Sequence, residues 1–545
     1  MATASAPPSA SYLWAAHLLL GLQRSGVEHV FLGPGSRSTP LVVSAAALGF
    51  KMVVHPDERS AAFLALGAAR ALRKPALWIT TSGSAVANGH PAVMEAFMDE
   101  VPLLLITADR PIELHHVGAN QTAPQEHIFS PHVRWQVQVP APDATVSPRF
   151  LSTLAERAAR EATAPTRSGP VHINMAFREP FGDAVAASAA IAAMKRQADP
   201  SPSTALQLPI STHRTLDLSP FTSASKPLVI VGRLPNPAAA RWTEDLIRRT
   251  GAPALCDIGS MCTQDDQRCC LTHLDRVTEL SPDDTPNALL IIGDRPVSKH
   301  IWTWIEAAEC PIWHLSSSSA PLDPMHSGIT HATITYAEHI TTSDPTAVLP
   351  AWYDRWQALR TQAVPHAPPD PPEISKIVSH IQRSIAPHQL LYLASSMTVR
   401  YFDRYGTLGR EPVWIGMNRG VSGIDGTLAT ALGMSMALDV PATIVLGDLA
   451  MIYDLNALTL RPQTQQPITV IVLNDGGGSI FERLPIAHHG GVFGPYFRAD
   501  HAFQFAEVAH ALGWEAISVR GAQQLEEALN GRDQHSSYFV NVALQ

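Results

Sequence analysis

The chain alternates short, continuous apolar runs with longer segments in which apolar residues recur at helical spacing. Eleven runs of this kind lie at Val30–Leu32, Met52–Val54, Leu77–Thr80, Leu103–Thr107, Leu228–Val231, Ala254–Cys256, Ala288–Ile292, Leu390–Leu393, Val413–Ile415, Thr443–Leu446 and Ile468–Leu473. Runs rich in Val, Ile and Leu are typical of parallel strands that are buried on both faces. The pattern therefore predicts an α/β protein whose mostly parallel sheets are flanked by helices.

Two segments interrupt this pattern and are expected to be linkers. Residues 186–212 are rich in Ala, Ser and Pro, and residues 364–373 carry five prolines, which a helix interior does not tolerate. They divide the 545 residues into three predicted domains, residues 1–185, 186–370 and 371–545, each with its own sheet.

The first and third of these domains resemble each other in sequence order. The tripeptide Ala-Leu-Gly ends at Gly67 and again at Gly433, and each copy is followed by a proline, Pro75 or Pro441, and then by a strand. Both pairs are 366 residues apart, so the helix, the proline and the strand match at a single offset. This regularity predicts a duplicated module.

The two copies differ at positions that bear charge. At the same offset Asp448 corresponds to Ser82, and Glu58 corresponds to Ile424. The third domain thus has a carboxylate where the first has a hydroxyl, and the first has a carboxylate where the third is aliphatic. We therefore expect one copy to bind a cation and the other copy to have a different role.

Composition and charge narrow the classes of function. The chain is 46% apolar and 16% charged with a net charge of −9, which argues against a general binder of nucleic acids or anionic membranes. An anionic substrate would therefore need a few locally placed arginines. No basic stretch precedes an apolar one at the N-terminus, and the apolar segment 13–22 is too short to span a bilayer, so we expect a cytoplasmic protein.

Three consecutive glycines, Gly476 to Gly478, directly follow a predicted buried strand and Asp475. Asp448 lies 27 residues earlier, at a Gly-Asp step after the preceding strand. Both carboxylates should emerge at the same edge of a parallel sheet, where α/β proteins bind ligands. Hard oxygen donors suit Mg²⁺, and glycines let the backbone approach a diphosphate. The alternative is that both are ordinary turns after buried strands.

These residues resemble the signature of thiamine-diphosphate-dependent enzymes, Gly-Asp-Gly followed after 25–30 residues by Asn-Asn; here it is GDL and then LNDGGG. The resemblance implies thiamine diphosphate with Mg²⁺ or Mn²⁺, and metal ligation by Asp448, Asp475 and the carbonyl of Gly477. Asn474 remains an alternative to Asp475. The further cofactor contacts that it implies are Gly447, Leu449 and Ile480.

The same resemblance assigns Glu58 to the glutamate that hydrogen-bonds the aminopyrimidine ring of the cofactor and so takes part in catalysis. Ile424, its counterpart in the other copy, is the candidate for the aliphatic side chain beneath the bent cofactor. The alternative is that Glu58 is a first-turn acid favoured by the helix dipole, a role that Asp57 could fill equally well. Because this family places its site between two subunits, we expect a homodimer or a homotetramer.

Longer motifs indicate one branch of these enzymes. They are GPGSRSTPL (33–41), TSGSAVAN (81–88), LLITADRPIELHHVGANQ (104–121), GPVHINMAFREP (169–180), NRGVSGIDG (418–426), GDLAMIYDLNAL (447–458) and GGGSIFERLP (476–485). Together they resemble the MenD family, the 2-succinyl-5-enolpyruvyl-6-hydroxy-3-cyclohexene-1-carboxylate (SEPHCHC) synthases of menaquinone biosynthesis. The resemblance implies a transferase that decarboxylates 2-oxoglutarate and adds the succinyl carbanion equivalent to isochorismate by 1,4-addition, giving SEPHCHC and CO₂.

Both implied substrates are dicarboxylates, so arginines in bidentate geometry are expected. The positions that match the family's substrate residues are Ser36, Arg37, Arg110, Asn120, Gln121, Ser396, Arg400 and Arg419, with Ile480, Phe481 and Leu484 as the apolar wall. Lys299, in GDRPVSKH, is the nearest match for a basic group supplied by the middle domain.

Two other functions compete with this interpretation. His115-His116 stands where simple 2-oxo acid decarboxylases of this superfamily carry a catalytic histidine pair, so such a decarboxylase is the alternative enzyme. A scaffold without catalytic activity is the alternative outside enzymes, and it is disfavoured because both the Gly-Asp step and the glutamate are present.

Overall fold

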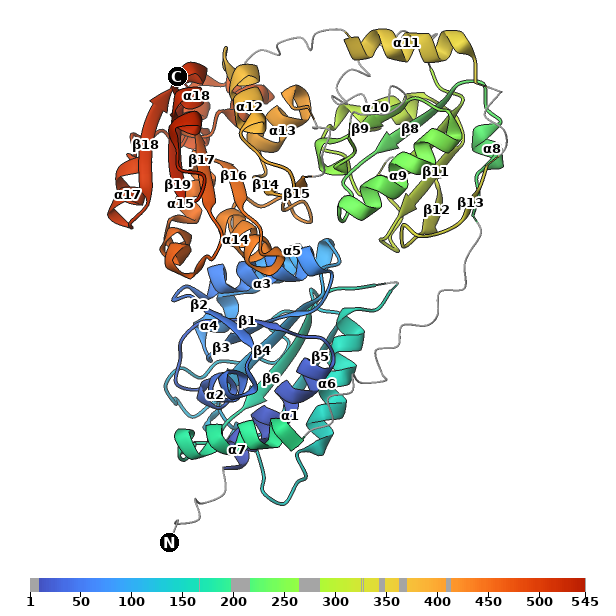
Figure 1. Ribbon diagram of the computed structural model, residues 1–545. Coiled ribbons are helices and arrows are strands. Elements are labelled where there is room, and N and C mark those ends of the chain that lie inside the picture. The colour runs from blue at the N-terminus through green and yellow to red at the C-terminus, as the bar shows by residue number, and fades with distance from the viewer. Residues whose placement is uncertain are drawn as a thin grey trace. The chain divides into compact units, whose positions relative to one another are not determined.

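Figure 1 shows a computed structural model of residues 1–545. The structure describes residues 9–165, 167–197, 216–263, 285–324, 326, 328–342, 348–361, 370–407 and 413–544. These residues form three large sheets and one two-stranded sheet, and every strand pair among them is parallel. The predicted α/β class is confirmed.

The first sheet has the strand order β2-β1-β3-β4-β6-β5. Its strands are β1 (His29–Leu32), β2 (Lys51–Val54), β3 (Ala76–Thr80), β4 (Leu103–Asp109), β5 (Trp135–Val139) and β6 (Val171–Ala176). The helices around it are α1 (Ala10–Arg24), α2 (Thr39–Leu48), α3 (Glu58–Leu72), α4 (Ser84–Asn88), α5 (His90–Met98), α6 (Arg149–Ala162) and α7 (Ala184–Gln197). Helices α1, α2, α6 and α7 build a core with one face of the sheet, while α3 and α5 lie on the other side (Figure 1).

The last sheet has the order β15-β14-β16-β17-β19-β18. Its strands are β14 (Leu390–Leu393), β15 (Trp414–Gly416), β16 (Ala442–Gly447), β17 (Ile468–Asn474), β18 (Glu515–Arg520) and β19 (Tyr538–Ala543). The helices of this part of the chain are α12 (Ile374–Arg383), α13 (Met397–Tyr405), α14 (Thr427–Leu438), α15 (Asp448–Tyr453), α16 (Gly490–Phe497), α17 (Phe505–Ala511) and α18 (Gly521–Gly531). When strands are counted from the start of each sheet, both orders read 2-1-3-4-6-5, which confirms the predicted duplication.

The matched glycines of the two copies meet in space. A Cβ at Gly67 in α3 would lie 2.0 Å from the carbonyl oxygen of Thr430, and one at Gly433 in α14 would lie 2.1 Å from that of Leu64. Only glycine lets two helix backbones approach so closely. The repeated Ala-Leu-Gly is therefore a contact between equivalent helices of the duplicated module.

The middle of the chain forms a five-stranded sheet of order β12-β11-β10-β8-β9 and a two-stranded sheet β13-β7. Its strands are β7 (Leu216–Asp217), β8 (Pro227–Val231), β9 (Ala254–Cys256), β10 (Ala288–Ile292), β11 (Ile312–Ser316), β12 (Thr330–Thr333) and β13 (Ile340–Thr341). Its helices are α8 (Ser219–Thr222), α9 (Pro237–Thr250), α10 (His300–Ala307) and α11 (Pro350–Thr361).

All eleven predicted runs are strands in the structure, but the first predicted linker is partly wrong. Helix α7 continues to Gln197, and Ala187 and Ile191 are buried in the first core, because alanine-rich sequence also favours a helix that packs closely. Residues 198–212 and 364–369 of the two predicted linkers lie outside the described residues.

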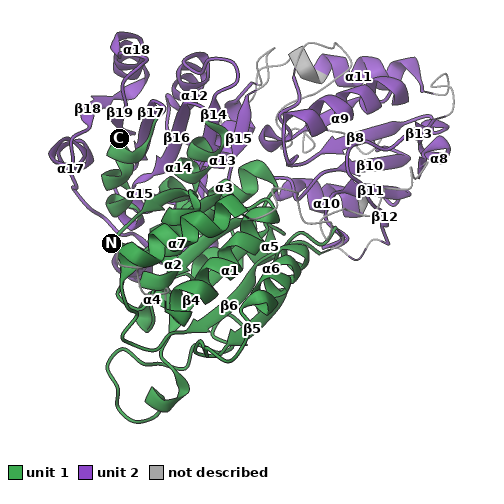
Figure 2. Ribbon diagram, turned by 60° about the horizontal axis from the view of Figure 1, so that its bottom comes forward, with its two compact units in different colours: residues 1–210, 418–439, 454–465 green, residues 211–417, 440–453, 466–545 purple. Residues whose placement is uncertain are grey.

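Two compact units emerge from the contacts within the chain, and they cut across the predicted domains (Figure 2). Unit 1 comprises residues 1–210, 418–439 and 454–465, and unit 2 comprises residues 211–417, 440–453 and 466–545. Helix α14 belongs to unit 1 because it packs on α3. Among the described helices, none combines the length and the apolarity that crossing a bilayer requires.

Candidate active site

The glycine run after β17 adopts a backbone that other residues avoid. Gly476, Gly477 and Gly478 have φ values of 79°, 137° and 83°. A Cβ at Gly477 would also lie 2.7 Å from the carbonyl of Ala499. Side chains are therefore excluded from this loop by both backbone conformation and space.

The two predicted acidic ligands converge on this loop within unit 2. Asp448, which begins α15 and is only 3% exposed, accepts a hydrogen bond from the Gly477 amide at 3.0 Å through Oδ2. Asp475 accepts from the same amide at 3.1 Å and from the Gly478 amide at 2.8 Å through Oδ1. Burial and then the charge of Asp475 raise the pKa of Asp448. A cation between these carboxylates would relieve both effects.

The surrounding contacts decide which side chain faces Asp448. The second oxygen of Asp475 accepts from the Ser479 amide at 3.2 Å and hydroxyl at 2.6 Å. Asn474 instead donates to Asn541 at 3.2 Å and accepts from the Gly476 amide at 3.0 Å. Asp475 therefore shares a partner with Asp448, which favours it over Asn474 as the second ligand.

The carbonyl of Gly477 accepts one hydrogen bond, from the amide of Ala499 at 3.1 Å, and a carbonyl has a second lone pair. No group of three His, Cys, Asp or Glu side chains forms a metal site in the described ranges, so a cation here would use two carboxylates and backbone oxygen. This donor set suits a hard divalent cation that also takes phosphate oxygens. The two carboxylates and the Gly477 carbonyl therefore fit the metal ion of the implied cofactor.

His501 is a neighbour of this site that the sequence did not reveal. Its Nε2 lies 3.1 Å from Oδ2 of Asp448, both side chains are 4% exposed, and its ring stacks on Phe503 at 4.7 Å. A lone histidine 53 residues after Asp448 carries no spacing signal. Only the return of the chain past the glycine loop brings it there.

The other predicted contacts in unit 2 lie on elements next to these carboxylates. Leu449 packs against the glycine loop, since a Cβ at Gly478 would lie 2.9 Å from its Cδ1. Phe481 meets Phe497 edge to face at 5.8 Å. Ile480 is half-buried against the core and Leu484 is 41% exposed.

The predicted pair on α13 is joined by a local contact. Ser396 precedes the helix with φ at 72°, and the exposed Arg400 donates to its carbonyl one turn later.

Glu58 stands at the start of α3 in unit 1, and its neighbour does the capping. Asp57 accepts from the amides of Arg59 at 2.8 Å and Ser60 at 3.3 Å, as an N-cap residue does. Glu58 is therefore not needed as the capping acid. A Cβ at Gly33 would lie 2.7 Å from its Cγ, and the Asn88 amide lies 3.4 Å from its Oε2.

Two predicted arginines gather at the carboxyl edge of the first sheet. Arg37, after β1, is 7% exposed, donates to the Phe177 carbonyl at 2.8 Å and pairs with Glu179 at 3.2 Å. Burial and then the charge of Arg37 lower the pKa of Arg110, which follows β4. Nε of Arg37 and Nη1 of Arg110 are buried and have no hydrogen-bond partner in the part of the chain that the structure describes. Two adjacent cations with spare donors are suited to a dianion.

The neutral candidates border these arginines. Gln121 is 3.5 Å from Nη2 of Arg110 and donates to the Ser82 carbonyl at 2.8 Å. Ser36 and Asn120 are exposed on neighbouring loops. His115 contacts the Arg110 carbonyl at 3.0 Å, so it is held by the local backbone.

The loop with Arg419 and Ile424 precedes α14 and is held by a carboxylate that the sequence did not reveal. Glu95 of α5, 1% exposed, accepts from the amides of Gly420 at 2.9 Å and Val421 at 2.8 Å. Arg70 in turn donates to Glu95 at 3.0 Å. Because these partners are 325 residues apart in the chain, no local pattern indicates them.

Comparison with known proteins gives independent evidence on the family. Residues 14–131 match the family model for the N-terminal TPP binding domain of thiamine pyrophosphate enzymes, and residues 396–542 match that for the C-terminal TPP binding domain. A relative from Salinibacter ruber is 37% identical over 92% of this chain and 88% of its own length. Relatives from Rubrobacter xylanophilus and Chlorobium luteolum are 35% and 32% identical over 96% and 98% of this chain and 93% and 94% of their own lengths.

All three relatives are named 2-succinyl-5-enolpyruvyl-6-hydroxy-3-cyclohexene-1-carboxylate synthase. The match to the Chlorobium luteolum relative covers 98% of this chain, so it extends across all three large sheets. The chain belongs to the 2-succinyl-5-enolpyruvyl-6-hydroxy-3-cyclohexene-1-carboxylate synthase family of thiamine-diphosphate-dependent enzymes.

Proposed function

We propose that this protein decarboxylates 2-oxoglutarate and adds the remaining succinyl unit to isochorismate, forming SEPHCHC and CO₂ in menaquinone biosynthesis. The observation that carries this proposal is similarity along nearly the whole chain to relatives that are named for this reaction. The simple decarboxylase is not favoured by these names, and His115 is occupied by a backbone contact.

The residues of unit 2 are assigned to holding the diphosphate end of the cofactor. Asp448, Asp475 and the Gly477 carbonyl would bind Mg²⁺ or Mn²⁺, which would offset the negative charge of the diphosphate. When bound, thiamine diphosphate supplies a carbon nucleophile and an electron sink for decarboxylation. The amides of the glycine loop donate to the two carboxylates, which holds both side chains in place.

The residues of unit 1 are assigned to the reacting end and to the substrates. Glu58 would hydrogen-bond the ring nitrogen of the aminopyrimidine and so hold a proton there. Ile424 would support the cofactor from beneath. Arg37 and Arg110 would bind substrate carboxylates through their unpartnered N–H groups, and Arg419 and Arg400 would assist.

Assembly and location complete the proposal. We infer a homodimer or homotetramer in the cytoplasm, with Glu58 of one subunit serving the diphosphate site of another. Analytical ultracentrifugation of the cofactor-loaded protein measures the assembly, and a monomeric active enzyme would contradict it.

The test is an assay of isochorismate consumption by absorbance with 2-oxoglutarate, Mg²⁺ and thiamine diphosphate, together with release of CO₂. The proposal expects both signals to depend on both substrates. Release of the aldehyde from 2-oxoglutarate without isochorismate consumption would instead identify a decarboxylase.

The role of Glu58 is tested by Glu58→Gln. We expect cofactor affinity by calorimetry to stay within about threefold while turnover falls by at least about 100-fold, the range in which acid–base groups contribute. Asp57→Asn is the matched control, because asparagine also caps helices and the charge is removed one residue away. Normal turnover of Glu58→Gln would show that the assigned role is wrong.

A further inference from the structure

A cavity of about 250 Å³ lies at the amino ends of the strands of the last sheet. It is bordered by Gln389 ahead of β14, by Thr443 at the start of β16 and by Thr469 at the start of β17. Asp448 and Asp475 follow the other ends of β16 and β17, about six residues or roughly 20 Å away at 3.3 Å per residue. The cavity therefore belongs to the edge of the sheet opposite the candidate active site.

Arg532 brings an uncompensated positive charge to this cavity. Its Nη2 donates to the Ser384 carbonyl at 3.2 Å, whereas its Nη1 is buried and has no hydrogen-bond partner among the described residues. Among the lining residues there is no Asp or Glu, and burial lowers the pKa of the guanidinium. A buried N–H without a partner is destabilising, and a bound acceptor would remove that cost.

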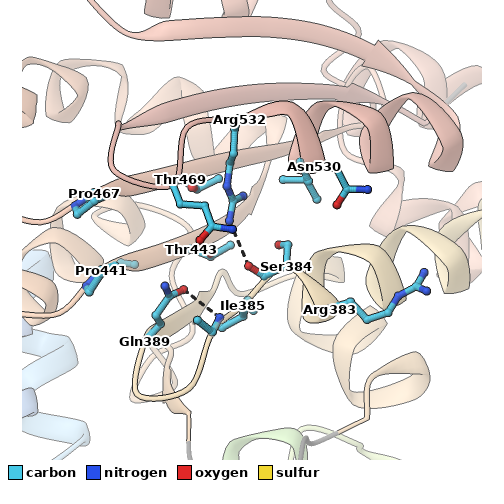
Figure 3. Close-up of a pocket in the computed structure, with 14 residues that line it drawn as sticks. Arg383, Ser384, Ile385, Gln389, Pro441, Thr443, Pro467, Thr469, Asn530 and Arg532 are labelled. Carbon is cyan, nitrogen blue, oxygen red and sulfur yellow. Dashed lines mark hydrogen bonds between the residues drawn. The ribbon is translucent and has the colours of Figure 1, made fainter.

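The second arginine at the cavity is engaged elsewhere. Arg383 lies 2.8 Å from His380 and 3.7 Å from Glu526. Figure 3 shows Arg383 extending away from the cavity while Arg532 reaches toward Ser384. Arg532 is thus the charge that faces a ligand.

Two threonines add neutral donors on one wall. Thr443 and Thr469 are paired residues of neighbouring parallel strands, so their side chains lie on the same face of the sheet. They are 1% and 6% exposed, and both line the cavity. The opposite border includes the apolar side chains of Ile385 and Leu529.

We propose that this cavity binds a small organic carboxylate, which accepts hydrogen bonds from Arg532 and the two threonine hydroxyls while its apolar part packs against Ile385 and Leu529. The volume equals the share of about eight water molecules at about 30 Å³ each, which suits a ligand the size of benzoate. Nothing in this site depends on the cofactor, so its binding is measured separately from the proposed enzymatic activity.

The test is calorimetric titration of the full-length protein with benzoate and with its neutral analogue benzamide. We expect benzoate to bind at least about tenfold more tightly than benzamide, and Arg532→Gln to weaken benzoate by at least about tenfold, as for loss of a charged hydrogen bond. Arg520→Gln removes an exposed arginine of the same sheet outside the cavity and should leave the affinity unchanged.

A second variant leaves Arg532 unchanged and fills the cavity. Ala386 lines the cavity and is exposed, so Ala386→Trp should fold normally and obstruct the site, again weakening benzoate by at least about tenfold. Circular dichroism checks the fold of each variant. If Arg532→Gln does not fold, the benzoate affinity of Ala386→Trp tests the proposal. The proposal is overturned if benzoate does not bind, if benzamide binds equally well, or if Ala386→Trp binds as tightly as the wild type.

Discussion

Replacing Gly67 by alanine tests whether the duplicated helices depend on their glycine contact. The added Cβ would lie 2.0 Å from the carbonyl oxygen of Thr430 and 2.9 Å from the amide nitrogen of Met434. Real Cβ contacts essentially never fall below 3.0 Å, so α3 and α14 must separate locally by about 1 Å. The clash is with backbone, so no side-chain rotation relieves it.

The expected magnitude follows from two opposing effects. Overpacking of a well-packed interface costs about 1–3 kcal/mol. Alanine in a helix interior gains back up to about 1 kcal/mol relative to glycine. The net effect is a loss of about 1–2 kcal/mol, which corresponds to a decrease in Tm of roughly 2–8 °C for a unit of 150–250 residues.

The assay combines thermal unfolding by circular dichroism with amide hydrogen exchange of the two helices. Exchange in α3 and α14 should accelerate together, because each helix loses protection when the other moves away. Gly531→Ala is the matched control: it also places alanine in a helix, and its Cβ would have no atom within 4 Å. If Gly67→Ala were as stable as the wild type with unchanged exchange, the close helix contact would not exist.

Three further predictions concern two buried carboxylates and the glycine loop. Burial raises the pKa of Asp454 to about 7 from 3.8, so the contribution of its protonated side chain to stability is fully present below about pH 4 and is lost as the pH rises through 7. Asp454→Asn should flatten the dependence of the free energy of unfolding on pH, measured by urea unfolding at pH 4 to 8. An unchanged pH dependence would contradict this prediction. Glu95→Gln should weaken the hydrogen bonds that hold the loop before α14 and destabilise unit 1 by about 1–3 kcal/mol. Amide hydrogen exchange at residues 418–424 should become faster, and unaltered exchange would refute this role. Gly477→Ala should weaken the binding of Mg²⁺ and thiamine diphosphate, measured by calorimetry, by at least about tenfold, because alanine rarely adopts the φ of 137° found at this position. Gly491→Ala is the control, because a Cβ at Gly491 would have no atom within 4 Å, and its affinity should not change. Equal affinities of the two variants would argue against the loop as the diphosphate site.

Local sequence determined much of this protein. Continuous apolar runs at Val30–Leu32 or Ile468–Leu473 are strands because only residues buried on both faces tolerate such composition. The edge strands β5 and β18 were missed because their exposed faces carry polar residues, as in Trp135–Val139 and Glu515–Arg520, and so resemble loops or helices. The spacing of Asp448 and Asp475 likewise indicated a shared sheet edge, because parallel strands place their carboxyl ends together.

Only the tertiary structure decided which groups complete these sites. His501 reaches Asp448 and Glu95 reaches the loop at Gly420 across long stretches of chain, and Arg532 faces a cavity at the amino edge of the last sheet. A strand or a glycine turn is encoded by the preferences of a few neighbouring residues. A hydrogen bond between distant segments depends on how whole helices and sheets pack, and no short segment of the sequence contains that information.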